Sequence, residues 1–140
     1  MMYQDVVIVI PAFEPDQRML ELLRDIRARE NKPFEIVLID DGSGPDYKAL
    51  FEEAEEKYAC HLLTHSENKG KGRALKTAIS YILEKLPQAK GIVTIDSDGQ
   101  HTYEDTLKCL DEFLRHPDSL VLGVRKFENS VPLRSRFGNV

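Results

Sequence analysis

The sequence predicts an α/β fold in which a doubly wound, mainly parallel sheet carries helices on both faces. Two observations predict this fold. Short continuous runs of valine, isoleucine and leucine recur along the chain, and such runs are typical of strands that are covered on both faces. Stretches with apolar residues at helical spacing lie between these runs. Their alternation favours right-handed crossovers between parallel strands.

The expected strands and helices alternate from the start of the chain. The strands are expected at residues 6–10, 36–39, 92–95 and 120–124, with a weaker strand at 60–64. Apolar stripes indicate four helices between them, over residues 19–26, 47–58, 75–86 and 103–114. The chain shows no internal repeat and no low-complexity stretch.

Length and charge divide the chain into two parts. The 140 residues fit a domain of ordinary size, and we expect the α/β domain to occupy residues 1–124. Residues 125–140 show no clear periodicity and carry four basic residues against one acidic residue. We interpret this basic segment as the start of a further region of a larger protein.

Composition and charge exclude several classes of protein. Hydrophobic residues make up 41% of the chain and charged residues 31%, as in soluble globular proteins. The formal net charge of -5 does not favour nucleic acid as a partner. Cys60 and Cys109 lack CxxC spacing, so we interpret both as reduced core thiols. The apolar run at residues 6–10 is too short to span a bilayer.

Polar residues gather in the loops that follow the expected strands. The carboxyl ends of parallel strands meet at one edge of a sheet, and ligands bind there at the point where the strand order reverses. The loops concerned are residues 11–15, 40–45, 68–73 and 96–101, together with Arg125 after the last strand. Of the four histidines, only His101 adjoins this expected site.

The loop after the 92–95 strand carries the strongest chemical signal. Asp96 and Asp98 follow the strand at alternate positions. Two carboxylates so near to each other repel unless a cation lies between them. Mg²⁺ and Mn²⁺ prefer oxygen ligands, which the two aspartates and the Gln100 side chain can supply. The alternative interpretation is an aspartate turn that caps the next helix.

The other loops each have a binding interpretation and a structural one. Asp41 can accept a hydrogen bond from a base or ribose, or it and Asp40 can serve as caps of a helix that begins near Pro45. Residues 68–73, which include Lys69, can approach a phosphate or form a solvated helix start. Arg125 can bind a diphosphate or lie on the surface.

Taken together, these loops resemble the family 2 glycosyltransferases, which have the GT-A fold with a Rossmann-like nucleotide-binding half. The resemblance is strongest to the polyprenyl (dolichol) phosphate mannosyl- and glucosyltransferases. Four segments carry it: VVIVIPAFEP at 6–15, IVLIDDGSG at 36–44, ENKGKGRAL at 67–75 and VTIDSDGQH at 93–101. The set in this order is specific, whereas each piece alone is not.

The resemblance implies a role for residues of each loop. It places Pro11, Ala12 and Phe13 around the nucleoside, Asp41 on the base, Asp96 and Ser97 on the ribose and diphosphate, and Arg125 on the donor phosphates. It makes Asp98 and Gln100 ligands of Mg²⁺ or Mn²⁺, with Asp96 near the metal. We therefore expect Asp96, Asp98 and Gln100 to hold the cation, Asp96 and Asp98 to be the catalytic residues, and Glu14 and Lys69 to be further donor-binding residues. The sequence departs from the pattern in its Phe-Glu-Pro, where relatives often have Tyr-Asn-Glu.

The expected function is transfer of a sugar from a UDP- or GDP-sugar to a polyprenyl phosphate, with residues 1–124 binding the donor and the basic segment beginning the acceptor side. An ionised acceptor phosphate needs no general base, which agrees with the lack of an obvious one. We expect a cytoplasmic location, at the inner face of the membrane if the parent protein is membrane-associated. The alternatives are a non-catalytic nucleotide-sugar-binding module and a receiver-like signalling domain.

Overall fold

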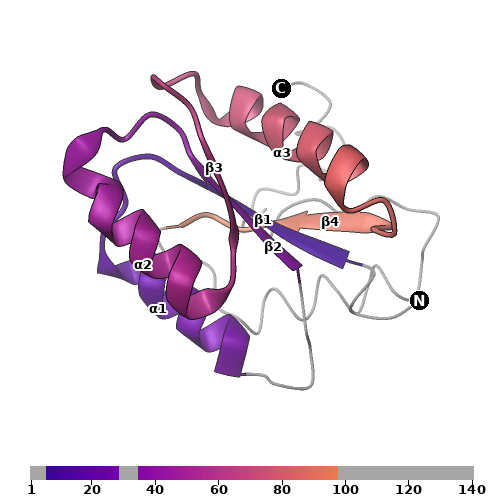
Figure 1. The fold of residues 1–140 in the computed structure, drawn as a ribbon, viewed down its shortest axis with the longest axis horizontal. Coiled ribbons are helices and arrows are strands. Elements are labelled where there is room, and N and C mark those ends of the chain that lie inside the picture. Colours follow the sequence, from indigo (N-terminus) through magenta and orange to yellow (C-terminus); the bar gives the residue numbers. More distant parts are fainter. Residues whose placement is uncertain (1–5, 29–34, 98–140) are drawn as a thin grey trace, which may run out of the picture.

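The computed structural model describes residues 6–28 and 35–97 (Figure 1). The strand expected at 120–124, the helix expected at 103–114 and the basic segment 125–140 lie outside the described residues. None of the helices within the described ranges is both long and apolar enough to cross a bilayer.

The described residues form one parallel sheet with helices between successive strands, which confirms the α/β prediction. The four strands are β1 (Val6–Ala12), β2 (Glu35–Asp40), β3 (His61–Thr64) and β4 (Gly91–Thr94). The helices are α1 (Gln17–Ala28), α2 (Lys48–Tyr58) and α3 (Lys71–Lys85), preceded at α2 by the short 3₁₀ helix η2 (Pro45–Tyr47). All strand pairings are parallel, in the order β3-β2-β1-β4.

Helices cover both faces of this sheet, as Figure 1 shows with α1 and α2 on one side and α3 on the other. Alternate residues of β1 explain the arrangement, because Val6, Ile8 and Ile10 pack in the cluster that contains α1 and α2. Val7 and Val9 pack in the cluster that contains α3. Burial on both faces is why the strands appear in the sequence as unbroken apolar runs.

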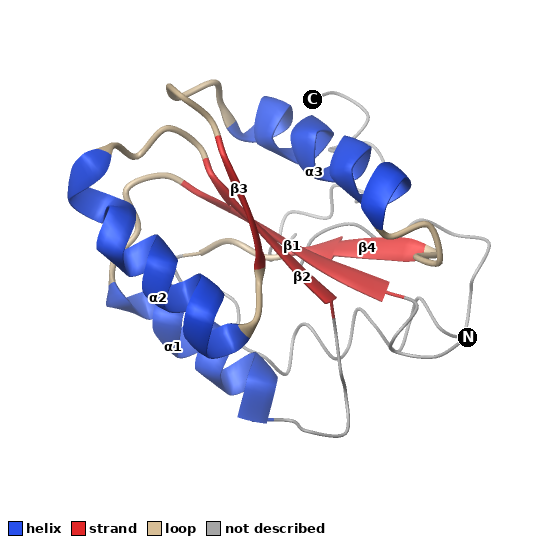
Figure 2. Cartoon of the chain, viewed as in Figure 1, coloured by secondary structure: helices blue, strands red, loops and turns tan. Residues whose placement is uncertain are grey.

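The strand order reverses between β1 and β4, and a ligand is expected to bind at the carboxyl ends of these two strands. The chain runs from β1 to β2 and β3 on one side, and then returns to pair β4 with the opposite side of β1. The crossover through α3 therefore covers the face opposite α1 and α2, and the carboxyl ends of β1 and β4 mark the point where the strand order reverses, which is where open α/β sheets bind ligands. In Figure 2 the described parts of the loops that follow the four strands all lie at the same end of the sheet, where the strands finish.

Candidate functional site

A hollow of about 200 Å³ lies at the carboxyl ends of β1 and β4. Residues from four separate loops line it, as the strand order requires. They are Pro11, Ala12, Phe13, Asp41, Asn68, Gly70, Lys71 and Asp96. Five of the residues singled out in the sequence thus lie together: Pro11, Ala12, Phe13, Asp41 and Asp96.

The loop after β1 gives the hollow an apolar wall and an exposed ring. Pro11 and Ala12 are the last residues of β1, and Phe13 is 48% exposed. Glu14 has a left-handed backbone with φ of 48°, and its amide donates a hydrogen bond to Ser43 Oγ at 2.8 Å. Its side chain is exposed, and Glu14 is not among the residues that line the hollow.

Asp40 and Asp41 stabilise the rim of the hollow and do not cap a helix. Gly44 is the cap residue of η2, which has no side-chain cap bond, so the capping interpretation of both aspartates is wrong. Asp40 accepts a hydrogen bond from the Ser43 amide at 2.9 Å. The Asp41 carboxylate accepts bonds from the amides of Lys69 at 3.0 Å and Gly70 at 2.9 Å, across to the loop before α3.

His65 completes the environment of Asp41, and the expectation that only His101 adjoins the site is therefore wrong. His65 Nδ1 lies 2.7 Å from Asp41 Oδ1, and both residues are buried. Burial opposes ionisation of Asp41, but the hydrogen bonds from His65 and the two amides outweigh it and lower the pKa of the carboxyl group. The sequence offered no signal for this contact, because its two partners lie 24 residues apart.

Gly42 holds the loops after β2 and β3 in direct contact. Its φ is 76°, and a Cβ at this position would lie 2.1 Å from the carbonyl carbon of Glu67 and 2.2 Å from the amide nitrogen of Asn68. Only glycine fits both the backbone conformation and the space. The two loops therefore form one packed unit on this side of the hollow.

An ion pair spans the hollow between α3 and the end of β4. Lys71, the first residue of α3, places Nζ 2.6 Å from Asp96 Oδ1. The Asp96 side chain is 18% exposed and that of Lys71 is 42% exposed. Lys71 belongs to the basic loop 68–73 that the sequence connects with a phosphate, although the phosphate contact was expected of Lys69. Lys69 instead contributes its amide to Asp41, and it does not line the hollow.

The donor chemistry of Asp96 fits a hard divalent cation, since a carboxylate oxygen at the edge of an open hollow is the ligand type that Mg²⁺ and Mn²⁺ prefer. The described residues contain no group of three acidic, histidine or cysteine side chains that would hold a metal on their own. The other expected ligands, Asp98 and Gln100, lie outside the described residues, as do Arg125 and His101. Ser97 directly follows Asp96 in a turn and is half-buried.

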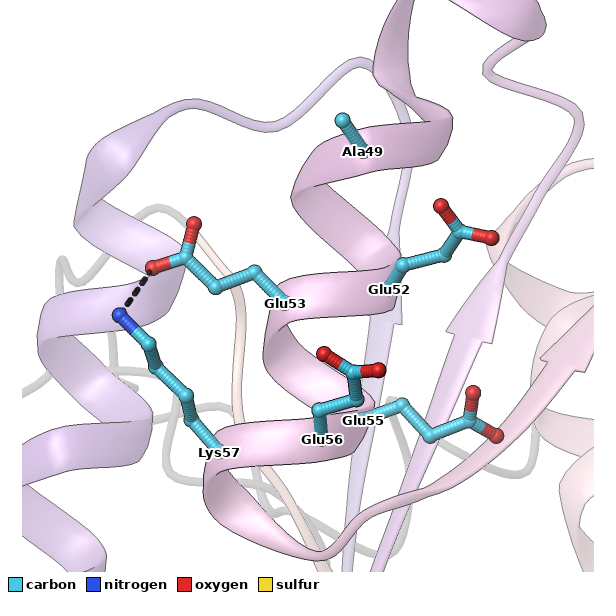
Figure 3. Close-up of a pocket in the computed structure, with 6 residues that line it drawn as sticks. All are labelled: Ala49, Glu52, Glu53, Glu55, Glu56 and Lys57. Atoms are coloured by element: carbon cyan, nitrogen blue, oxygen red, sulfur yellow. Dashed lines mark hydrogen bonds and ion pairs between the residues drawn. The ribbon is translucent and has the colours of Figure 1, made fainter.

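A second hollow, of about 450 Å³, lies on the outer surface of α2 and differs in charge (Figure 3). Figure 3 shows four glutamates around it and one lysine, Lys57, which forms an ion pair with Glu53 at 3.1 Å. All of its lining residues come from one helix, and its net negative charge would repel a phosphate. The hollow on α2 is therefore a poor site for a phosphate ligand, whereas the hollow at the ends of β1 and β4 lies where the strand order reverses and is the candidate site.

Comparison with known proteins identifies relatives over nearly the whole chain. The family model described as Glycosyl transferase family 2 matches residues 7–138. An uncharacterised protein of Methanocaldococcus jannaschii is 30% identical over 135 residues, which are 95% of this chain and 57% of that protein. An undecaprenyl-phosphate 4-deoxy-4-formamido-L-arabinose transferase of Pseudomonas savastanoi is 34% identical over 71% of this chain and 30% of its own.

A third relative is the UDP-N-acetylglucosamine–dolichyl-phosphate N-acetylglucosaminyltransferase of Methanococcus voltae, which is 25% identical over 96% of this chain and 59% of its own. The chain thus spans less than two thirds of the length of these relatives.

Two solved structures share the fold. Residues 1–349 of S. aureus TarS in complex with UDP-GlcNAc superimpose with a TM-score of 0.56 and 22% identity, over 81% of this chain and 32% of that TarS fragment. The mannosyltransferase PcManGT of Pyrobaculum calidifontis, in complex with GDP-Man and Mn²⁺, also superimposes with a TM-score of 0.56, at 24% identity. That match covers 78% of this chain and 32% of PcManGT. Both structures are of the GT-A type.

Proposed function

The chain belongs to glycosyl transferase family 2, and from this premise we propose that it is the donor-binding part of an enzyme that transfers a sugar from a nucleoside-diphosphate sugar to a polyprenyl phosphate. The observation that carries the proposal is the hollow at the β1–β4 switch point, which joins an exposed aromatic ring, a buried carboxylate and a Lys71–Asp96 ion pair. Family membership leaves the receiver-like alternative without support.

Each part of the hollow suits a part of the donor. Phe13 offers an apolar surface to the base or ribose at the end of β1. The Lys71 ammonium group is the cation within the described residues of this hollow, and it would attract the diphosphate. Pro11 and Ala12 would form the wall against the nucleoside, and Ser97 would meet the ribose or diphosphate. Glu14 and Lys69 lie beside this space, with exposed side chains.

The cation is proposed to be held by Asp96 together with Asp98 and Gln100. When bound, Mg²⁺ or Mn²⁺ neutralises negative charge on the leaving nucleoside diphosphate. Lys71 adds a positive charge on the same side of the hollow, and Arg125 is proposed to add another. The relative of known structure that contains GDP-Man and Mn²⁺ supports this assignment through its shared fold.

The acceptor is proposed to be a polyprenyl phosphate because two of the relatives are named for undecaprenyl and dolichyl phosphate. A phosphate acceptor is ionised near neutral pH, so the described residues need not supply a general base. Such an acceptor resides in a membrane, and we propose that the parent protein works at its cytoplasmic face. Acceptor binding would then fall to residues beyond the donor hollow.

Calorimetry with UDP, GDP and their sugar conjugates, with and without Mn²⁺, tests the donor proposal. We expect one nucleotide series to bind in the presence of Mn²⁺. The variant Lys71→Met removes the ammonium group from the hollow and should raise the Kd about tenfold, the effect of losing one charge-assisted hydrogen bond.

The matched control is Lys57→Met, which removes an ammonium group from the α2 hollow and should leave the Kd unchanged. Absence of binding by any of these nucleotides, or equal effects of the two lysine variants, would contradict the proposal. A turnover assay separates the enzyme from a non-catalytic module. If the protein is such a module, the full-length protein binds the donor but releases no nucleoside diphosphate when both the donor and a polyprenyl phosphate are supplied.

A further inference from the structure

A chain of polar side chains, with buried Asp41 and His65 and half-buried Thr77, connects the loop after β2 to the second turn of α3. His65 stands at its centre, with Nδ1 2.7 Å from Asp41 Oδ1 and Nε2 2.8 Å from Thr77 Oγ1. The side chains of His65 and Asp41 are 8% and 5% exposed. Neither His65 nor Thr77 lines the donor hollow, so a direct contact with the donor does not account for this arrangement.

Asp41 has almost all of its hydrogen-bonding capacity engaged within the protein. A carboxylate offers about four acceptor positions. Three are taken here: Oδ1 accepts from His65 and from the Lys69 amide, and Oδ2 accepts from the Gly70 amide. An ionised carboxylate cannot donate, so the hydrogen between Asp41 and His65 belongs to Nδ1. At most one acceptor position, on Oδ2, is left for a donor group in the hollow.

These bonds determine where α3 begins. Gly70 is the cap residue of α3, and its amide is tied to Asp41. Lys71 follows directly and reaches across the hollow to Asp96. A shift of Asp41 would therefore move the Gly70 amide and, with it, the ammonium group that faces the diphosphate in the proposed function.

We propose that His65 is a positioning residue for donor binding: through Nδ1 it holds the Asp41 carboxylate in the orientation that anchors the Lys69 and Gly70 amides and the start of α3 against the hollow. This inference rests on the proposed function for its effect on the donor. Thr77 contacts Nε2, on the far side of the imidazole ring. Loss of this hydrogen bond alone leaves the contact between His65 Nδ1 and Asp41 in place.

Two substitutions of His65 separate positioning from general stability. In His65→Asn the side-chain amide occupies about the place of Nδ1 and can still donate to Asp41. In His65→Gln it reaches about the place of Nε2 and keeps the contact with Thr77 instead. Both variants lose one of the two bonds, so a purely structural role would make them equally damaging. Thr77→Val is the third variant, because it removes only the Thr77 end.

Two measurements on the full chain decide the matter. We expect the Kd for the nucleoside diphosphate that binds the wild type with Mn²⁺ to rise about tenfold in His65→Gln and to stay within about threefold in His65→Asn and Thr77→Val. We also expect hydrogen exchange at the Lys69 and Gly70 amides to be faster in His65→Gln and unchanged in His65→Asn. Thermal unfolding of each variant serves as the control for folding, and we expect a cooperative transition in every case.

Equal exchange protection of the two amides in His65→Asn and His65→Gln would overturn the positioning role, and so would equal Kd values. The exchange measurement needs no ligand. A wild type that binds no nucleotide, but whose variants show the expected difference in exchange, would therefore overturn the proposed function and leave the positioning of the loop established.

Discussion

At the scale of single residues, Asp41 shows how a buried charge is kept ionised beside a binding site. Its carboxyl group loses hydration on burial and regains stabilisation from His65 and from the amides of Lys69 and Gly70, with a lowered pKa as the net result. A carboxyl group whose pKa is lower in the folded state stabilises the fold when ionised. Asp41 should therefore link the stability of the site loops to pH.

We predict that Asp41→Asn reduces the acid sensitivity of the fold. The contribution of ionised Asp41 is complete well above the unfolded pKa of about 3.9. It is lost as the pH falls through that value towards the lower folded pKa. Urea unfolding between about pH 7 and 3 should show a wild-type free energy that falls more steeply below about pH 4.5 than that of the variant.

Asp25→Asn is the control for this pH dependence. Asp25 lies in an exposed ion pair with Arg24 at 3.5 Å. Exposed pairs contribute little to stability. The pH curve of this variant should follow the wild type, and an Asp41→Asn curve parallel to the wild type would contradict the linkage.

Which residues line the hollow could be anticipated from the sequence only in part. Pro11, Ala12 and Asp96 come directly after the apolar runs at 6–10 and 92–95, so their position at the carboxyl ends of β1 and β4 follows from the sequence pattern. The role of His65, and that of Lys71 in place of Lys69, could not be predicted because they depend on contacts over 24 and 25 residues of sequence. The choice between Lys69 and Lys71 depends on where α3 begins, and that boundary is set by tertiary hydrogen bonds.

At the scale of elements, the two loops after β2 and β3 behave as one unit. Gly42 packs against the peptide between Glu67 and Asn68, and Asp41 accepts hydrogen bonds from the next two amides. The strand ends below are also joined, because the His65 amide donates to the Asp40 carbonyl at 2.8 Å. The rim of the hollow is thus organised before any ligand arrives, which lowers the entropic cost of binding.

We predict that Gly42→Ala destabilises the protein more than Gly44→Ala. Both glycines have positive φ, 76° and 95°, so alanine is strained at either position, at a cost of about 1–2 kcal/mol. Only at Gly42 would the added carbon also overlap backbone atoms, which raises the loss to about 3–4 kcal/mol. Urea unfolding measures both losses, and equal losses would show that the loops separate easily.

The order of elements was predictable because burial on two faces leaves a clear mark on β1 and β2. β3 was the weaker expectation, and it is a short strand at the edge of the sheet that the described residues form, with residues that are only half-buried or exposed. The expected start at Cys60 is one residue early. Cys60 precedes β3 as a buried free thiol, and burial raises its pKa to about 11. The interpretation of Cys60 as a reduced core thiol agrees with this environment.

At the scale of the whole molecule, the hollow at the ends of β1 and β4 and the hollow on α2 differ in the elements that form them and in how their carboxylates are paired. The hollow at the strand ends combines one ammonium group with carboxylates that are already paired. The α2 hollow is lined by four glutamates and one lysine. A divalent cation alone could be attracted to either, whereas a cation that bridges to a diphosphate should select the strand ends, where Lys71 favours the anion.

The most direct test of the donor site is the broadening of amide resonances by Mn²⁺ in the presence of the nucleoside diphosphate that binds the protein. The account predicts that broadening centres on Ala12, Asp41, Gly70 and Asp96, and that α2 resonances keep their width. Broadening centred on Glu52 to Glu56, or broadening that is the same with and without the nucleotide, would contradict it.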